Sequence, residues 1–263
     1  MTGSDARYTK PWYLATYLEM EWSDYLLSTD VEPSDILRPV QPQFYQRVVG
    51  LVTEWLKRYD QAVQRYCDVG GATGRMLYEL VNRLPSISEA VLAEPSSQFC
   101  AFARQLLFAR DRQEYIPIVS SLHDPLYRNV QSWPAPLEPS TRRRVDVYEV
   151  SSHQVPRPRG FFDLVTCLNV VDRVSRPLVL LQDLARLTRP RGLLVIASPM
   201  DFEVQFTPDE GLWLSDIREG LAEVDWEILE TTDCLYEVRP YTRKRIAYDA
   251  QVVLARRREP ARQ

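Results

Sequence analysis

Between residues 63 and 200, short strand-like runs alternate with longer helix-like runs, and this alternation constrains the fold more than any other feature of the sequence. The strand-like runs are rich in aliphatic residues, and the runs between them repeat apolar residues every three to four positions. Strands separated by helices pair in parallel, because each helix carries the chain back across one face of the sheet. The sequence therefore predicts an α/β fold with a mostly parallel sheet and helices on both faces.

The predicted strands of this stretch are residues 63–69, 89–94, 145–150, 161–171 and 193–199. The predicted helices between them are 73–84, 97–110 and 176–188, and the last is expected to end at the turn Pro190-Arg191-Gly192. A further helix is expected near 209–223, followed by two strands at 226–233 and 247–257 that form a hairpin-like pair. These segments together predict a seven-stranded sheet.

One principal domain with added segments accounts for the length of 263 residues. We expect a helical N-terminal cap over residues 1–62, a main domain over 63–256 and a disordered tail over 257–263. The stretch 111–144 contains five prolines and is predicted to be an insertion before the third strand. The aromatic helix predicted at 12–27 either packs on the main domain or acts as a lid, and the sequence leaves both open.

The overall charge and the cysteines restrict the partners of the chain. A net charge of −4 supplies no positive field for nucleic acid or an anionic membrane, so we expect neither and favour a small-molecule or peptide substrate. The four cysteines are widely spaced, which predicts no metal site. The first ten residues lack the apolar core of a signal peptide, so a cytoplasmic location is expected. Monomer and dimer both remain open.

A glycine-rich segment joins the first predicted strand to the first predicted helix, with the sequence Asp68-Val69-Gly70-Gly71-Ala72-Thr73-Gly74-Arg75. Glycines at such a turn let the backbone approach a ligand, and we expect side chains at Gly70 and Gly74 to obstruct it. Glu94 ends the second strand about 20 residues farther on, where a carboxylate accepts hydrogen bonds from ribose hydroxyls. Dinucleotide sites use the spacing G-x-G-x-x-G, which this loop lacks. The pattern favours a different nucleotide-like ligand.

Three motifs follow this loop in a fixed order: the acidic strand end at Glu94, the stretch 161–173 and the stretch 187–199. Together with the loop they resemble the class I S-adenosylmethionine-dependent methyltransferases over residues 64–200. The first motif of that class is (D/E)-x-G-x-G-x-G, and here the middle glycine is displaced to Gly71. The resemblance implies a Rossmann-like sheet and S-adenosylmethionine as the cofactor.

The same resemblance implies which residues contact the cofactor. Ser151 stands where the class usually has an acidic residue for the adenine amine, which weakens that particular contact. The expected cofactor-binding residues are Tyr17, Asp68, Gly70, Gly71, Gly74, Arg75, Glu94, Ser151, Ser152 and Leu168.

Two further resemblances concern the methyl acceptor. Residues 198–214 and 226–257 are similar to the methyltransferase domain of the ovothiol pathway, which methylates a ring nitrogen of 4-mercaptohistidine. The segment 167–173, Cys-Leu-Asn-Val-Val-Asp-Arg, is similar to a stretch of the protein-histidine methyltransferase family. Both families methylate imidazole nitrogen. The resemblance therefore implies N-methylation of a histidine-type substrate, either free or within a peptide.

Within this interpretation, Asn169 and Asp172 are the expected catalytic residues. An amide at Asn169 can orient an imidazole through the ring nitrogen that does not react, and Asp172 can accept an N–H and stabilise the cationic product. The expected substrate-binding residues are Asn169, Arg173, Asp201, Phe206, Tyr241 and Arg243. Structural roles compete with these: Asn169 as a turn residue, Asp172 with Arg173 as a helix cap and ion pair, and 241–245 as a solvated turn.

Two other functions stay open at this point. The same fold serves oxygen, nitrogen and carbon acceptors, so another small metabolite is one alternative. A cofactor-binding subunit without catalytic activity is the other, favoured by the displaced glycine and by Ser151. Binding of S-adenosylmethionine separates the second alternative from an enzyme, and an acceptor screen addresses the first.

Overall fold

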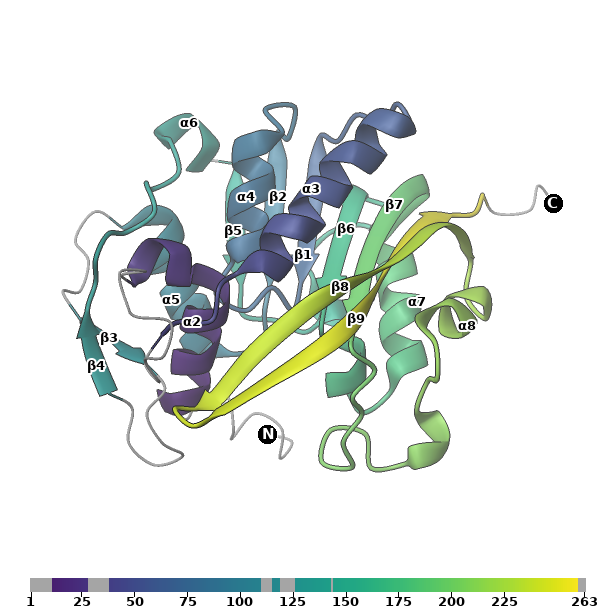
Figure 1. The fold of residues 1–263 in the computed structure, drawn as a ribbon. Helices are drawn as coiled ribbons and strands as arrows, with labels where there is room; N and C mark the ends of the chain where they lie inside the picture. Colours follow the sequence, from purple (N-terminus) through teal and green to yellow (C-terminus); the bar gives the residue numbers. More distant parts are fainter. Residues whose placement is uncertain (1–10, 28–37, 110–114, 119–125, 143, 260–263) are drawn as a thin grey trace.

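The computed structural model describes residues 11–27, 38–109, 115–118, 126–142 and 144–259. Its centre is a seven-stranded sheet in the order β5-β2-β1-β6-β7-β9-β8, flanked by helices (Figure 1). The pairings from β5 to β7 are all parallel, whereas β9 runs antiparallel to both β7 and β8. The predicted seven-stranded, mostly parallel Rossmann-like fold is confirmed.

Each predicted strand is present in this sheet. The bounds are β1 Arg65–Val69, β2 Glu89–Ala93, β5 Val145–Tyr148, β6 Phe162–Leu168, β7 Thr188–Ser198, β8 Trp226–Tyr241 and β9 Lys244–Arg257. Successive side chains of a strand point to opposite faces, so Tyr66 and Cys67 of β1 belong to two separate apolar clusters. Because helices cover both faces, the central strands are apolar on both sides and read as continuous apolar runs.

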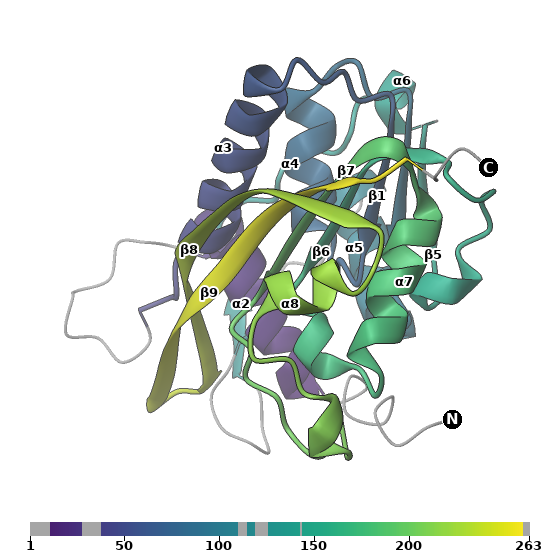
Figure 2. The same ribbon diagram turned by 90° about the vertical axis from the view of Figure 1, so that its right-hand side faces the viewer.

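The two apolar clusters show which helices cover which face. The cluster around Tyr66 contains buried residues of α3, α4 and α5, which span Gln43–Arg58, Arg75–Arg83 and Ser97–Phe108. The cluster around Cys67 contains Leu181 and Ile217 from α7 and α8, which span Pro177–Leu187 and Ile217–Ala222. Figure 2 shows the sheet between α3 and α4 on one side and α7 on the other. Helices therefore cover both faces, as predicted.

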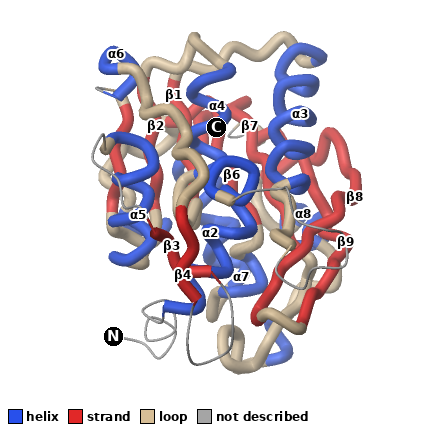
Figure 3. The backbone as a smooth tube through the Cα atoms, turned by 60° about the vertical axis from the view of Figure 1, so that its left-hand side comes forward, coloured by secondary structure: helices blue, strands red, loops and turns tan. Residues whose placement is uncertain are grey.

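The N-terminal helix α2, Pro11–Leu26, packs on the main domain. Its side chains Leu14, Leu18, Trp22 and Leu26 recur at helical spacing, are fully or almost fully buried, and join the apolar cluster of α3 to α5. The helix contacts β3 and β8, and it lies between the β3–β4 pair and the β8–β9 hairpin (Figure 3). This position brings α2 to the end of the sheet where the loops after the parallel strands lie.

Four predicted elements differ from the structure. The helix expected near 209–223 is divided into a 3₁₀ turn, Glu210–Leu212, and the short α8. The turn expected at Pro190 lies inside β7, where Phe162 pairs with Thr188 but Leu164 already pairs with Leu193. A bulge absorbs the additional residues of β7. β8 and β9 extend beyond their predicted bounds, because their outer parts form a two-stranded ribbon whose polar and apolar residues do not alternate strictly.

The predicted insertion contains structure of its own. An antiparallel pair, β3 Tyr115–Ile118 and β4 Leu126–Asn129, is followed by the single helical turn α6, Pro139–Arg142. Parts of the insertion and the end of the predicted tail lie outside the described residues, and Arg257 closes β9 rather than beginning the tail. Two 3₁₀ turns, η1 Ser152–Gln154 and η2 Val171–Arg173, follow β5 and β6. All four cysteines are buried and unbridged.

Candidate active site

A cavity of about 620 Å³ opens at the carboxyl ends of β1, β2, β5 and β6. Open α/β sheets bind their ligands at this edge, because the loops that follow the parallel strands meet there. Ten residues predicted from sequence to bind cofactor or substrate line the cavity: Tyr17, Asp68, Gly70, Gly71, Glu94, Ser151, Leu168, Asn169, Arg173 and Phe206. Seven others lie outside its lining: Gly74, Arg75, Ser152, Asp172, Asp201, Tyr241 and Arg243.

The glycine-rich loop forms the floor of the cavity between β1 and α4. Gly70 has a φ of +68°, and a Cβ there would lie 2.5 Å from Val170 Cγ2. A Cβ on Gly71 would overlap with the Asp68 carboxylate and with Leu92. These two positions therefore need glycine for the close approach of the loop to β6 and to Asp68, independently of any ligand.

Gly74 has a different function from the one predicted. It adopts a φ of +88° and caps α4, and a Cβ there would face Leu92, Ala103 and Leu107. Those side chains belong to the apolar interior and not to the cavity. A side chain at Gly74 would strain the backbone and crowd the core, and it would not project into the ligand space as expected from sequence.

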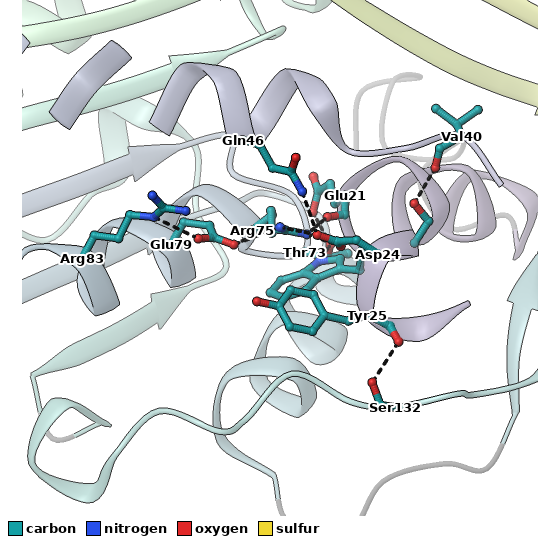
Figure 4. A network of polar contacts seen from close by, with 12 residues as sticks. Glu21, Asp24, Tyr25, Val40, Gln46, Thr73, Arg75, Glu79, Arg83 and Ser132 are labelled. Carbon is teal, nitrogen blue, oxygen red and sulfur yellow. Dashed lines mark hydrogen bonds and ion pairs between the residues drawn. The ribbon is translucent and has the colours of Figure 1, made fainter. Parts of the chain in front are cut away.

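Arg75 is also placed away from the cavity. Its guanidinium is 1% exposed and lies 2.7 and 2.8 Å from the two Asp24 oxygens, and its Nε donates to Glu79 Oε1 at 3.0 Å. It also donates to the carbonyl oxygen of Glu21. Figure 4 shows this network, in which Arg75 joins the start of α4 to α2. Arg75 therefore connects the cap to the domain.

Glu94 lies just after β2 and lines the cavity. Oε2 accepts the N–H of Ala72 in the glycine-rich loop at 3.1 Å, and Oε1 accepts the N–H of Ser96 at 2.8 Å. Burial raises the pKa of this carboxyl to about 7, although both N–H groups oppose that shift. Each oxygen retains a second lone pair, so Glu94 can still accept hydrogen bonds from two adjacent hydroxyls.

Asp68 and Glu21 are two further buried carboxyls in the lining. Asp68 accepts the Thr166 hydroxyl at 2.7 Å through Oδ1, while its buried Oδ2 accepts no hydrogen bond of normal geometry from the described residues. Glu21 of α2 accepts hydroxyls from Thr73 and from Tyr45, the latter at 3.2 Å. Burial raises the pKa of Asp68 to about 7 and that of Glu21 to about 8. Both carboxyls lack a strong cationic partner inside the cavity.

Asn169 follows β6 in a left-handed conformation, with φ of +57°. Asparagine tolerates this backbone better than most residues. Its N–H donates to the Ala197 carbonyl of β7 at 2.7 Å, which fixes the strand end. The oxygen and nitrogen of its side-chain amide are both buried and make no hydrogen bond to the described residues. The turn role and a ligand-binding role therefore coexist, since the backbone serves the first and the amide is available for the second.

Arg173 lines the cavity but is already neutralised. Its guanidinium donates to the Asp201 carbonyl at 2.6 Å and to Glu203 Oε1 at 3.0 Å, and it stacks on the Phe206 ring at 5.2 Å. Asp172 is buried behind it, 3.7 Å from Nη2. Burial raises the pKa of Asp172, and Arg173 opposes the shift. Asp172 and Asp201 therefore hold Arg173 in place, and they do not themselves line the cavity.

The remaining predicted residues divide between the cavity and its surroundings. Tyr17 packs against Phe99 with ring centroids 4.7 Å apart, and both rings line the cavity. Ser151 and Leu168 also line it, whereas the Ser152 hydroxyl donates to Asp183 Oδ2 at 2.7 Å. Tyr241 and Arg243 lie at the turn of the β8–β9 hairpin, where Tyr241 pairs with Lys244, and neither belongs to the lining. The substrate roles expected for these last two residues are not supported by their placement.

Glu21, Tyr45 and Tyr236 are among the lining residues that sequence reasoning missed, and they come from α2, α3 and β8. Glu21 and Tyr17 are four positions apart on α2, so the helical pattern of that segment places them on one face. A charged residue on the otherwise apolar face of a predicted helix is the signal that could have identified Glu21. Tyr45 and Tyr236 carry no comparable signal.

The fold and the site together identify a class of enzyme. The sheet order, the single antiparallel strand, the glycine-rich turn and the acidic residue ending β2 together are those of class I S-adenosylmethionine-dependent methyltransferases. Residues 43–226 match the family model described as "Methyltransferase domain", which is more than half of the chain. The protein belongs to this methyltransferase family, and S-adenosylmethionine is its cofactor.

Solved structures with the same fold are distant in sequence. The [4+2]-cyclase SpnF is 15% identical, with a TM-score of 0.52 over 82% of this chain and 83% of that one. YcgJ from Bacillus subtilis is 11% identical, with a TM-score of 0.53 over 82% of this chain and all of that one. The methyltransferase domain of bacterial CtHen1-C is 13% identical, with a TM-score of 0.52 over 82% and 100%. These likenesses concern the fold alone.

No curated protein sequence matches the chain. Within the part of the chain that the structure describes, no helix combines the length and the apolar character required to cross a bilayer. The described residues also contain no cluster of three or more His, Cys, Asp or Glu side chains arranged to hold a metal ion.

Proposed function

We propose that this methyltransferase methylates a ring nitrogen of an imidazole in a histidine-type acceptor, either a small molecule related to 4-mercaptohistidine or a histidine within a peptide. The observation that carries the proposal is the side-chain amide of Asn169, whose two polar atoms are buried at the cavity without partners among the described residues. The amide offers an NH₂ donor group and a carbonyl acceptor, so it can pair with either ring nitrogen of a neutral imidazole, which has one donor and one acceptor.

The residues around the cavity fit S-adenosylmethionine. Glu94 presents two oxygens with free lone pairs for ribose hydroxyls, and Gly70 and Gly71 of the loop line the same cavity. The unpartnered Oδ2 of Asp68 adds an acceptor for a cationic group. We assign these residues, with Ser151, Leu168 and Tyr17 of the lining, to the cofactor. An apolar or anionic cofactor would leave the buried carboxyls uncompensated.

The reaction requires orientation more than acid–base chemistry. When bound, S-adenosylmethionine would supply a methyl group from its sulfonium to the lone pair of one ring nitrogen. The electrons of the C–S bond would stay on sulfur, and the other ring nitrogen would release its proton to water. Asn169 holds the ring through the nitrogen that does not react, which selects the tautomer whose lone pair faces the methyl group. The Tyr17, Phe99 and Phe206 rings line the same cavity and exclude water from it.

Arg173 and Asp172 are assigned supporting roles. The neutralised guanidinium of Arg173 fixes Phe206 by stacking, and Asp172 fixes Arg173 from behind. Because Arg173 is occupied by acidic groups, we do not assign it to a substrate carboxylate. We propose that both are positioning residues for the acceptor side of the cavity.

An acceptor screen with methyl-labelled S-adenosylmethionine tests the proposal. The panel contains 4-mercaptohistidine, histidine and a His-x-His peptide, with tyrosine and lysine as acceptors that offer oxygen and amine nitrogen. Label transferred to imidazole compounds, and lost in Asn169→Ala, supports the proposal. Transfer only to tyrosine or lysine overturns the imidazole assignment and leaves a methyltransferase of another acceptor class.

A further inference from the structure

Glu21 is a cavity residue contributed by an element outside the sheet, and the cofactor contacts assigned above do not use it. It lies on α2, is 1% exposed and lines the same cavity as Asp68. Thr73 of the glycine-rich loop donates to Glu21 Oε2, and the same hydroxyl oxygen accepts the Trp22 Nε1–H at 2.8 Å. Two adjacent residues of α2 are therefore joined to the loop that forms the cavity floor.

Glu21 and Asp68 form an anionic pair without a cation of its own. The charge of Asp68 raises the pKa of Glu21, in addition to the larger effect of burial. Arg75 acts on Glu21 in the opposite direction, but its guanidinium is paired with Asp24 and Glu79. The Asp68 Oδ2 is buried and accepts no hydrogen bond of normal geometry from the described residues, although the backbone N–H of Leu77 also lies near this carboxyl and lowers its pKa. Two buried carboxyls that face one cavity in this way are stabilised by a cationic ligand group.

We propose that Glu21 is a cofactor-binding residue, which together with Asp68 receives the ammonium group of the amino-acid part of S-adenosylmethionine. The position of Glu21 supports the cofactor over the methyl acceptor, because its hydrogen-bond partner Thr73 belongs to the cofactor loop and not to the strand end at Asn169. Helix α2 is thereby a wall of the cofactor site as well as a cap. The proposal does not depend on the identity of the acceptor.

Two ligands that differ in the amino-acid part isolate this contact. S-adenosylhomocysteine carries the ammonium, whereas 5′-methylthioadenosine has the same nucleoside and a thioether but no amino-acid group. Calorimetric titration gives the affinity of both for the wild-type protein and for Glu21→Gln. We expect Glu21→Gln to weaken the binding of S-adenosylhomocysteine by about tenfold or more, which is the loss of affinity typical of removing a hydrogen bond to a charged group. We expect the affinity for 5′-methylthioadenosine to change by less than about twofold.

The number of protons released on ligand binding provides a second measurement, which should not change if Glu21 has a purely structural role. An ammonium beside Glu21 and Asp68 favours their charged forms, so binding near pH 7 releases protons to the buffer. Of the other titratable or charged groups near Glu21, Tyr45, Tyr236 and Arg75 have pKa values far above that pH. Glu94 lines the same cavity with a pKa of about 7, so its proton release should be common to wild type and variant. Titrations in buffers of different ionisation enthalpy should show smaller proton release for Glu21→Gln than for wild type.

Two variants keep the test decisive. Trp22→Phe removes the other hydrogen bond from α2 to Thr73 without changing charge, and it should lower both affinities equally or neither. Glu21→Asp retains the charge and serves if Glu21→Gln fails to fold; it should keep the preference for S-adenosylhomocysteine. The proposal is overturned if Glu21→Gln loses affinity for both ligands equally. It is also overturned if the affinity for S-adenosylhomocysteine is unchanged while the KM for the acceptor rises.

Discussion

Arg75, at the first position of α4, and Asp24 of α2 form a bidentate ion pair that connects the N-terminal cap to the domain. We expect Arg75→Met to lower the free energy of unfolding by about 3 kcal/mol, because it leaves Asp24 and Glu79 without their buried cationic partner. Urea unfolding measures the change. Arg58→Met is the matched control, since Arg58 is half exposed and solvent screens its ion pairs, so its loss should be much smaller. Equal losses in both variants would contradict the structural role of Arg75.

Gly71 permits the close contact between the cofactor loop and Asp68. We expect Gly71→Ala to weaken S-adenosylmethionine binding by more than about tenfold, because the added methyl group overlaps with Asp68 and Leu92 and displaces the loop. Calorimetric titration measures the affinity. Gly50→Ala on α3 is the control, because a Cβ there meets nothing within 4 Å. That substitution should stabilise the helix by about 0.5–1 kcal/mol and leave binding intact. Wild-type affinity in Gly71→Ala would show that the loop tolerates a side chain.

Asn169 combines a backbone role with an unpartnered amide. We expect Asn169→Gly to keep the left-handed backbone and to lower kcat by about tenfold to a hundredfold, with cofactor affinity unchanged. Asn169→Ala should show the same loss of turnover with an additional loss of stability of about 1 kcal/mol, because alanine is strained at positive φ. The measurement is steady-state kinetics with the acceptor found in the screen, alongside calorimetry with the cofactor. Wild-type turnover in the glycine variant would leave Asn169 with its backbone role alone.

The three buried carboxyls of the cavity predict how the stability of the ligand-free protein depends on pH. Burial raises the pKa of Asp68 and Glu94 to about 7 and that of Glu21 to about 8. In the unfolded chain the pKa values of these carboxyls are near 4, so the folded protein binds more protons than the unfolded chain between pH 4 and 8. These groups therefore lower the free energy of unfolding as the pH rises through that window. We expect the melting temperature to fall from pH 5.5 to pH 8, and saturating S-adenosylmethionine to reduce that fall.

Asp68→Asn provides the control for this effect, because it removes one titrating group at similar volume. Its melting temperature should depend less steeply on pH than that of the wild type. A wild-type melting temperature that rises over the same range would show that these carboxyls are ionised in the folded, ligand-free protein.

The cofactor side of the site was largely predictable because its residues lie at strand ends. Asp68, Gly70, Gly71 and Glu94 occupy fixed positions around the first two parallel strands, and short-range spacing determines where they meet. Gly74 and Arg75 belong to the same motif, but a side chain at position 74 would face the core, and the side chain of Arg75 faces α2. The spacing of the residues identifies the motif. The direction in which each side chain points depends on tertiary packing, which the spacing does not specify.

The acceptor side was harder to predict because it depends on long-range register. The strand expected at 226–233 continues to Tyr241, and the hairpin turn therefore falls at the residues that sequence assigned to the substrate. Tyr236 reaches the cavity instead, across from Tyr248. Tyr45 likewise reaches the cavity from α3. Its hydrogen bond to Glu21 connects α3 to α2, two helices that are not contiguous in the sequence.

The position of β9 has a consequence for the biosynthesis of the protein. This strand follows β8 in the chain, yet it lies between β7 and β8 in the sheet. While a ribosome still shields residues 244–257, the edge of β7 has no partner, and its apolar residues from Leu193 to Ala197 are open to other chains. Completion of the sheet must therefore wait for the last strand to be released. Nascent or truncated chains that end before residue 244 should depend on chaperones and aggregate without them.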